Sequence, residues 1–172
     1  EVVWRVLQID DYLIDFNRLL GETLQWSVAY AVCYIHSDAA HSGALLKVGS
    51  DDQAQVYLNG KLVYQSVNPR SHLADQDVVT GAVLKAGINV VVLKVVNEGN
   101  KWQGSVRFTD AAGRPLKRIR VTLDPERQDA PRPPPTKQPP SLGSNDGVES
   151  AAGSLSPDCL GRIFTILCNP FP

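Results

Sequence analysis

Apolar and polar side chains alternate with a period of two through residues 1–123, the pattern of strands that bury one face. Residues 27–35 are apolar on both faces, as expected for a central strand, and 88–96 are almost all β-branched. Further strands are predicted at 2–7, 44–48, 54–59, 61–64, 105–109 and 119–123. One short helix is expected around Tyr12–Leu20. Strands separated by short turns predict an all-β fold, an antiparallel β-sandwich.

Asn59 and Gly60 lie between two of these predicted strands. Both residue types tolerate positive φ, and an Asn-Gly pair between alternating segments is typical of a two-residue hairpin turn. We therefore expect 54–59 and 61–64 to pair as a β-hairpin.

The composition changes near Asp124 and divides the chain into three parts. Residues 1–123 are predicted to form the sandwich. Ten of the 12 prolines lie at or after Pro125, so 124–158 are predicted to be a disordered Pro/Ser-rich linker, because proline lacks a backbone donor and holds the chain extended. The tail, 159–172, turns apolar again. It is a strand that docks on the sandwich, the start of another domain, or an artefact of the expressed sequence.

The 17 basic and 18 acidic side chains leave a net charge of −1. This balance provides no long-range attraction for phosphate backbones or anionic lipid, so neither nucleic acid nor a membrane is an expected partner. No apolar run approaches the roughly 20 residues of a membrane-spanning helix. The chain contains no Met and opens in a strand-like segment, as expected of a piece of a longer protein.

Three cysteines are too few for a disulfide scaffold. Cys33 lies inside an apolar run and is predicted to be a buried free thiol. Cys159 and Cys168 could pair with each other, and the sequence leaves this open.

The sequence contains no catalytic motif, so we do not expect an enzyme. Consecutive carboxylates, such as Asp10-Asp11 and Asp51-Asp52, point to opposite faces of a strand and cannot flank one glycosidic bond. His36 and His41 have weak metal spacing, and no nucleophile elbow, zinc spacing or phosphate loop occurs.

Three segments occur in an order that resembles a known group of modules: 48–64, 84–97, and 102–108 with the turn that follows it. The order resembles galactose-binding-like jelly rolls, which are accessory modules of bacterial extracellular glycoside hydrolases, esterases and cell-surface proteins. Segment 48–64 is also similar to lectin domains of the protective-antigen type. The resemblance extends over roughly residues 26–123.

The resemblance implies a jelly-roll carbohydrate-binding module without catalytic activity. Such a module is secreted and brings a larger extracellular protein or enzyme to a polysaccharide or oligosaccharide, with covalently linked neighbour domains as its other partners. The alternative is a structural or protein-interaction module of a cell-surface protein, with no sugar ligand, because the same fold carries both roles.

In the protective-antigen-type lectins a similar Asp pair holds calcium, so the resemblance implies a Ca²⁺ site at Asp51 and Asp52. Calcium takes about six to eight oxygen ligands, and Asp75, Asp77 and Asn97 are further candidates. The alternative is a solvated turn in which the Asp side chains bond neighbouring backbone amides.

Sugars are bound by aromatic faces and by amide, carboxylate and guanidinium groups. Trp102 follows a polar turn and would either stack on a sugar at a loop rim or pack beneath the turn, whereas Trp4 and Trp26 have apolar neighbours and are expected in the core. Arg70 and His72 belong to the longest irregular connection, where recognition residues are common. The predicted carbohydrate-binding residues are Trp102, Tyr57, Gln55, Asn59, Arg70, His72 and Asn97.

Overall fold

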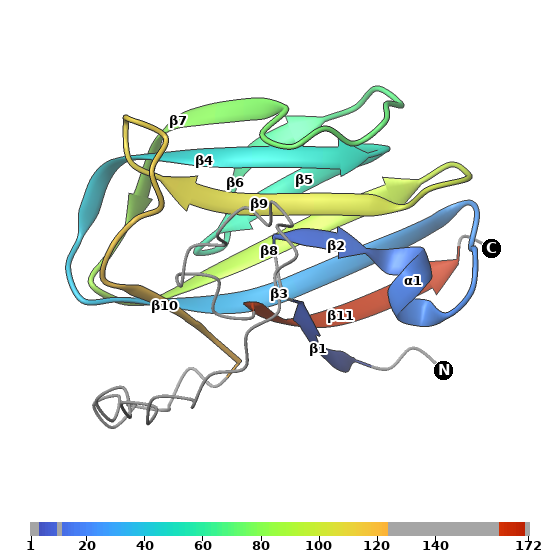
Figure 1. The fold of residues 1–172 in the computed structure, drawn as a ribbon, viewed down its shortest axis with the longest axis horizontal. Coiled ribbons are helices and arrows are strands. Elements are labelled where there is room, and N and C mark those ends of the chain that lie inside the picture. The colour runs from blue at the N-terminus through green and yellow to red at the C-terminus, as the bar shows by residue number, and fades with distance from the viewer. Residues whose placement is uncertain (1–3, 10–11, 124–161, 171–172) are drawn as a thin grey trace, which may run out of the picture.

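The computed structural model describes residues 4–9, 12–123 and 162–170. The predicted linker and Cys159 lie outside these residues. Two antiparallel sheets form a sandwich (Figure 1), which confirms the predicted fold class. Within the described residues, no helix has the length and apolar character needed to cross a membrane.

The sheets contain seven and four strands. The larger sheet has the spatial order β1 (Arg5–Ile9), β11 (Arg162–Pro170), β3 (Ser27–Ser37), β8 (Gly87–Asn97), β5 (Gln53–Leu58) and β6 (Lys61–Ser66), and β10 (Ile119–Thr122) also pairs with β3. The smaller sheet has the order β2 (Leu13–Asp15), β9 (Gln103–Thr109), β4 (His41–Asp51) and β7 (Asp77–Leu84). One short helix, α1 (Phe16–Leu20), follows β2.

Most of the strands predicted from the alternation are present, and the Asn59–Gly60 turn joins β5 to β6 as predicted. The helix is shorter than expected, because Leu13–Asp15 pairs with β9 as a strand. The prediction also missed β7. Its pairing with β4 contains register shifts, and Gly81 within it has φ of 75°, so an irregular edge strand broke the period of two.

The apolar tail contributes a strand to the larger sheet. β11 lies between β1 and β3, and pairs with Ser27 to Val32 of β3. β10 pairs with the remaining part of the same edge, from Tyr34 to Ser37. Of the three interpretations of the tail, the structure therefore shows the strand that docks on the sandwich.

Alternate side chains of both sheets point inward and form one core. Cys33 is one of them, and it is buried and outside any disulfide, as predicted. Trp102 and Phe16 are completely buried, and their ring centroids lie 5.1 Å apart. The Trp102 indole N–H donates to the Val95 carbonyl at 3.4 Å. Gly104 leaves room for this packing, because a Cβ there would lie 2.8 Å from Val95 Cγ2.

The positions of all three tryptophans correct the sequence interpretation. Trp102 has no exposed surface and cannot stack on a sugar, because it packs beneath the turn between β8 and β9. Trp4 and Trp26 were expected in the core, but they are 48% and 61% exposed. Trp26 has φ of 48° directly before β3, so the chain turns there and the side chain leaves the alternation of the strand.

We expect Trp102→Ala to lower the free energy of unfolding by about 3–5 kcal/mol, because it opens a large cavity beside Phe16. Trp26→Ala, the matched control at an exposed tryptophan, should change the free energy by less than about 0.5 kcal/mol. Urea unfolding followed by far-ultraviolet circular dichroism measures both values. Equal losses in the two variants would contradict the placement of Trp102 in the core.

Candidate functional site

An open polar cleft of about 490 Å³ lies at one end of the sandwich. Three connections form it: the β4–β5 corner, the β6–β7 connection and the β8–β9 connection, at the right-hand end in Figure 1. The pairing register brings them together, because Asp51 is opposite Gln103, and Gln53 is opposite Val96. The lining residues are Asp51, Asp52, Pro69, Arg70, Ser71, His72, Gly99, Asn100, Lys101 and Gln103.

The floor of the cleft is the Asp51–Asp52 corner, where the chain passes from the smaller sheet to the larger one. Both residues are buried, with exposed fractions of 7% and 8%. The Asp52 carboxylate accepts the backbone N–H of Arg70 at 3.3 Å and that of Glu98 at 2.8 Å. It thus ties the two other connections to the corner.

The Asp51 carboxylate has a raised pKa. Burial raises its pKa, and the neighbouring Asp52 charge raises it further, although a hydrogen bond from the His72 backbone opposes the shift. The Asp51 carboxylate therefore holds a proton, or accepts a hydrogen bond from a donor, more readily than an ordinary surface aspartate does.

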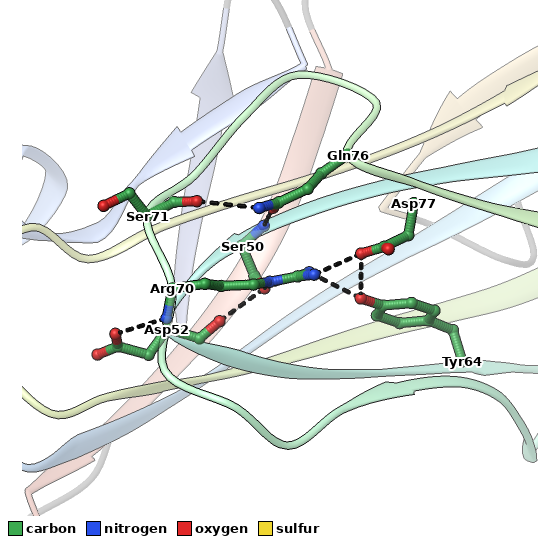
Figure 2. Close-up of polar contacts among 7 residues, drawn as sticks. All are labelled: Ser50, Asp52, Tyr64, Arg70, Ser71, Gln76 and Asp77. Atoms are coloured by element: carbon green, nitrogen blue, oxygen red, sulfur yellow. Dashed lines mark hydrogen bonds and ion pairs between the residues drawn. The ribbon is translucent and has the colours of Figure 1, made fainter.

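Arg70 holds the β6–β7 connection against the strands (Figure 2). Its guanidinium donates to Asp77 Oδ2 at 2.5 Å, to the Tyr64 hydroxyl at 2.7 Å and to Ser50 Oγ at 2.8 and 3.0 Å. The Tyr64 hydroxyl donates in turn to Asp77 Oδ2 at 2.6 Å. Burial by itself would raise the pKa of Asp77, but the hydrogen bonds from Tyr64 and Arg70 outweigh it and lower the pKa.

A second ion pair holds the same connection on its other side. Arg107 of β9 donates from Nε to Asp75 Oδ1 at 2.7 Å, and from Nη2 to the other carboxylate oxygen. This bidentate bond lowers the pKa of Asp75. The Arg107 guanidinium also lies 5.4 Å from the centre of the Tyr12 ring.

Gly49 gives the connection the space to lie on β4. A Cβ at this position would overlap the Leu73 carbonyl oxygen and would lie 2.9 Å from both His72 Nε2 and Ser105 Oγ. His72 Nε2 and Ser105 Oγ are themselves 2.8 Å apart, within hydrogen-bonding distance. The imidazole is therefore anchored at the base of the cleft.

The predicted sugar-binding residues do not form one site. Arg70 and His72 line the cleft, but the Arg70 guanidinium bonds protein groups and is not directed at a ligand. Asn97 is completely buried, donates to the Leu24 carbonyl and accepts the Gly99 N–H, so its predicted sugar contact is wrong.

The other predicted residues lie elsewhere. Asn59 occupies the β5–β6 turn and bonds Asn89 and the Val90 N–H, which gives it a structural role. Tyr57 and Gln55 are partly exposed on β5 and bond each other at 3.0 Å. Neither of them lines the cleft.

Sequence reasoning missed the β8–β9 side of the cleft. Asn100, Lys101 and Gln103 line it, and Asn100 has φ of 63°. The polar turn before Trp102 was the available signal, and the tryptophan itself packs beneath this turn. Trp26 precedes Ser27, which pairs with Asn97, so this exposed ring lies at the same end of the sandwich.

The side chains at the corner do not by themselves fit a calcium ion. Within the described residues, no three His, Cys, Asp or Glu side chains are placed to share a metal. Each Asp52 oxygen already accepts one backbone N–H group, so a cation there would share these oxygens with Arg70 N and Glu98 N. Calcium binding at Asp51 and Asp52 stays a prediction that needs further oxygen ligands.

No known protein family and no curated protein matches the chain. The solved structures that are similar to it include the following two. A family 35 carbohydrate-binding module from an environmental isolate is 18% identical, with a TM-score of 0.39 over 59% of this chain and 77% of that one. The PA14 domain of the antifreeze protein MpAFP is 12% identical, with a TM-score of 0.35 over 65% and 82%.

Gly49→Ala should displace the β6–β7 connection and destabilise the protein by about 1–3 kcal/mol, because the new methyl group overlaps the Leu73 carbonyl. Limited proteolysis within residues 67–76 and urea unfolding measure the two effects. Gly99→Ala is the control, since a Cβ there meets no atom closer than 4.0 Å. Unchanged proteolysis of Gly49→Ala would contradict the close approach.

Asp77→Asn should lower the free energy of unfolding at pH 7, and the difference from the wild type should shrink in acid. The folded pKa of Asp77 is lowered from 3.8, so its stabilising contribution is complete above that value. It is lost as the pH falls through the folded pKa. Urea titrations from pH 7 down to about pH 2 test this, and a pH-independent difference would contradict it.

Proposed function

We propose that this chain is a non-catalytic carbohydrate-binding module whose cleft binds sugar hydroxyls. The observation that carries the proposal is the cleft itself, whose lining combines carboxylate, amide and ammonium groups on connections that the sandwich holds in place. Donors and acceptors on a rigid scaffold suit hydroxyls, because each hydroxyl both donates and accepts.

The groups available to a ligand come mainly from the β8–β9 connection. Asn100 and Lys101 are exposed and line the cleft, and Gln103 is partly exposed. A neighbouring hollow of about 480 Å³ shares Asn100 and Lys101 with the cleft. A ligand longer than one sugar can therefore continue past Lys101, and Trp26 provides an exposed ring at the same end.

Two features of the corner support binding without catalysis. Asp52 uses both carboxylate oxygens to accept backbone N–H groups, which fixes it as a structural acceptor. His72 is anchored to Ser105 at the base of the cleft. We propose further that the module is secreted and belongs to a larger extracellular protein that it brings to polysaccharide.

Affinity electrophoresis in gels with neutral soluble glucan, xylan or galactan tests the cleft, each with and without calcium. We expect retardation on at least one of them, and Asn100→Ala combined with Lys101→Ala should weaken it at least about fivefold, because both residues lie on the rim. Lys85→Ala, an exposed lysine in the β7–β8 turn, is the control and should keep full retardation.

No retardation on any neutral polysaccharide, or equal retardation of the cleft and control variants, would contradict binding in the cleft. Retardation that is lost with EDTA and restored by calcium would support the predicted metal at Asp51 and Asp52. Retardation that EDTA does not change would contradict the predicted calcium site.

A protein-interaction module is the second candidate, and one feature favours it. β7 is an edge strand of the smaller sheet, and its Val78 and Val83 are 47% and 53% exposed. Such an edge can pair with a strand of a neighbouring domain. Failure of all the polysaccharide gels would favour this function.

A further inference from the structure

Charge is segregated in this sandwich. The seven strands of the larger sheet contain no Asp or Glu, although the whole chain has a net charge of −1. On the described residues of these strands, the Lys and Arg side chains are Arg5, Lys61, Lys94 and Arg120. The smaller sheet, in contrast, contains Asp15, Asp51 and Asp77.

The outer face of the larger sheet carries three tyrosines. On β3 the buried side chains alternate with the partly exposed Tyr30, Val32 and Tyr34. The same alternation on β5 leaves Gln55 and Tyr57 partly exposed on this face. The face therefore presents aromatic and amide groups to the solvent.

The strand register arranges these groups in two adjacent rows. Lys94 of β8 lies between Tyr30 and Gln55 in one row. Val92 lies between Val32 and Tyr57 in the next. The rings thus surround an aliphatic floor, and neighbouring strands are about 4.8 Å apart.

The contacts within the face orient these side chains along the sheet. The Lys94 ammonium lies 5.9 Å from the centre of the Tyr30 ring. The Tyr57 hydroxyl donates to the Gln55 side chain two residues away on the same strand. This bond directs the Tyr57 side chain along the strand, and the residue is partly exposed.

One end of the face carries surplus positive charge. Arg118 and Arg120 share a single carboxylate, that of Asp38, at 3.8 and 3.7 Å. Arg120 also bonds His36 at 2.9 Å, and these two residues are register partners on β10 and β3. The side chain of Arg118 is 70% exposed, so its charge is available to an anion.

We propose that the outer face of the larger sheet is a second binding site, and that its ligand is a chain of acidic sugars such as a polyuronate. Tyrosine faces stack on sugar C–H surfaces, and the Gln55 amide bonds hydroxyls. Lys94 and Arg120 pair with carboxylates. The absence of acidic residues from these strands removes the repulsion that a polyanion meets elsewhere on this chain.

This site is independent of the proposed cleft. Tyr57, Lys94 and Arg120 do not line the cleft, and Asn100 and Lys101 are not on the sheet. The neutral polysaccharides report on the cleft, whereas an acidic polysaccharide reports on the face. Failure of one proposal is therefore distinguishable from failure of the other.

Affinity electrophoresis of the full chain in gels with polygalacturonate tests the face. We expect wild-type retardation that Lys94→Gln and Arg120→Gln each weaken about two- to fivefold, because each removes one exposed ion pair. Retardation should also fall with added NaCl, and less steeply in these variants than in the wild type. Tyr57→Ala should weaken it at least about fivefold through the lost ring face.

Lys47→Gln is the matched control, because Lys47 is a partly exposed lysine in the middle of a strand of the smaller sheet. It should retain full retardation, as should the Asn100→Ala, Lys101→Ala double variant. A thermal midpoint within a few degrees of the wild type shows that each variant is folded, and Lys94→Gln remains informative if Tyr57→Ala is unstable.

Three results would overturn the proposal. The first is no retardation of the wild type on polygalacturonate, and the second is the same loss of retardation in Lys94→Gln as in Lys47→Gln. The third is Lys94-dependent retardation on a neutral polysaccharide that equals the retardation on polygalacturonate. Stronger Lys94-dependent binding to polyuridylate than to polygalacturonate would also overturn it, in favour of nucleic acid.

Discussion

The shape of the cleft depends on the two backbone N–H groups that the Asp52 carboxylate accepts. A buried carboxylate without donors costs several kcal/mol, so the β6–β7 and β8–β9 connections must approach the corner closely enough to supply Arg70 N and Glu98 N. The corner joins β4 of one sheet to β5 of the other. The Asp52 carboxylate therefore fixes the positions of both connections relative to the point where the two sheets meet.

The ion pairs around the β6–β7 connection explain which groups remain for a ligand. Arg70 and Arg107 bond Asp77 and Asp75, and these internal pairs hold the connection on both sides. The two guanidinium groups and their partner carboxylates are thus paired with each other within the protein. The cleft is left with amides, an ammonium group and a carboxylate of raised pKa, a set suited to hydroxyls more than to strong ions.

The distribution of charge gives the molecule two surfaces of different chemistry. Acidic residues lie at the β4–β5 corner and in the β6–β7 connection, and the strands of the larger sheet have none. The two binding sites that we propose, the cleft at one end and the outer face of the larger sheet, therefore differ in the charge of their surroundings.

The alternation of apolar and polar residues, together with the Asn59–Gly60 pair, was sufficient to predict the sandwich, the long central strands and the hairpin. In a half-buried strand every second side chain faces the core, so the period of two is visible in the sequence. It missed β7, where a bulge breaks that period. The placement of Trp26 and Trp102 required the tertiary structure, since burial at the end of a strand depends on which distant element packs there. The same holds for the cleft, whose Asp51 and Asn100 meet only because β4 and β8 end at the same edge of the sandwich. No local pattern carries that information.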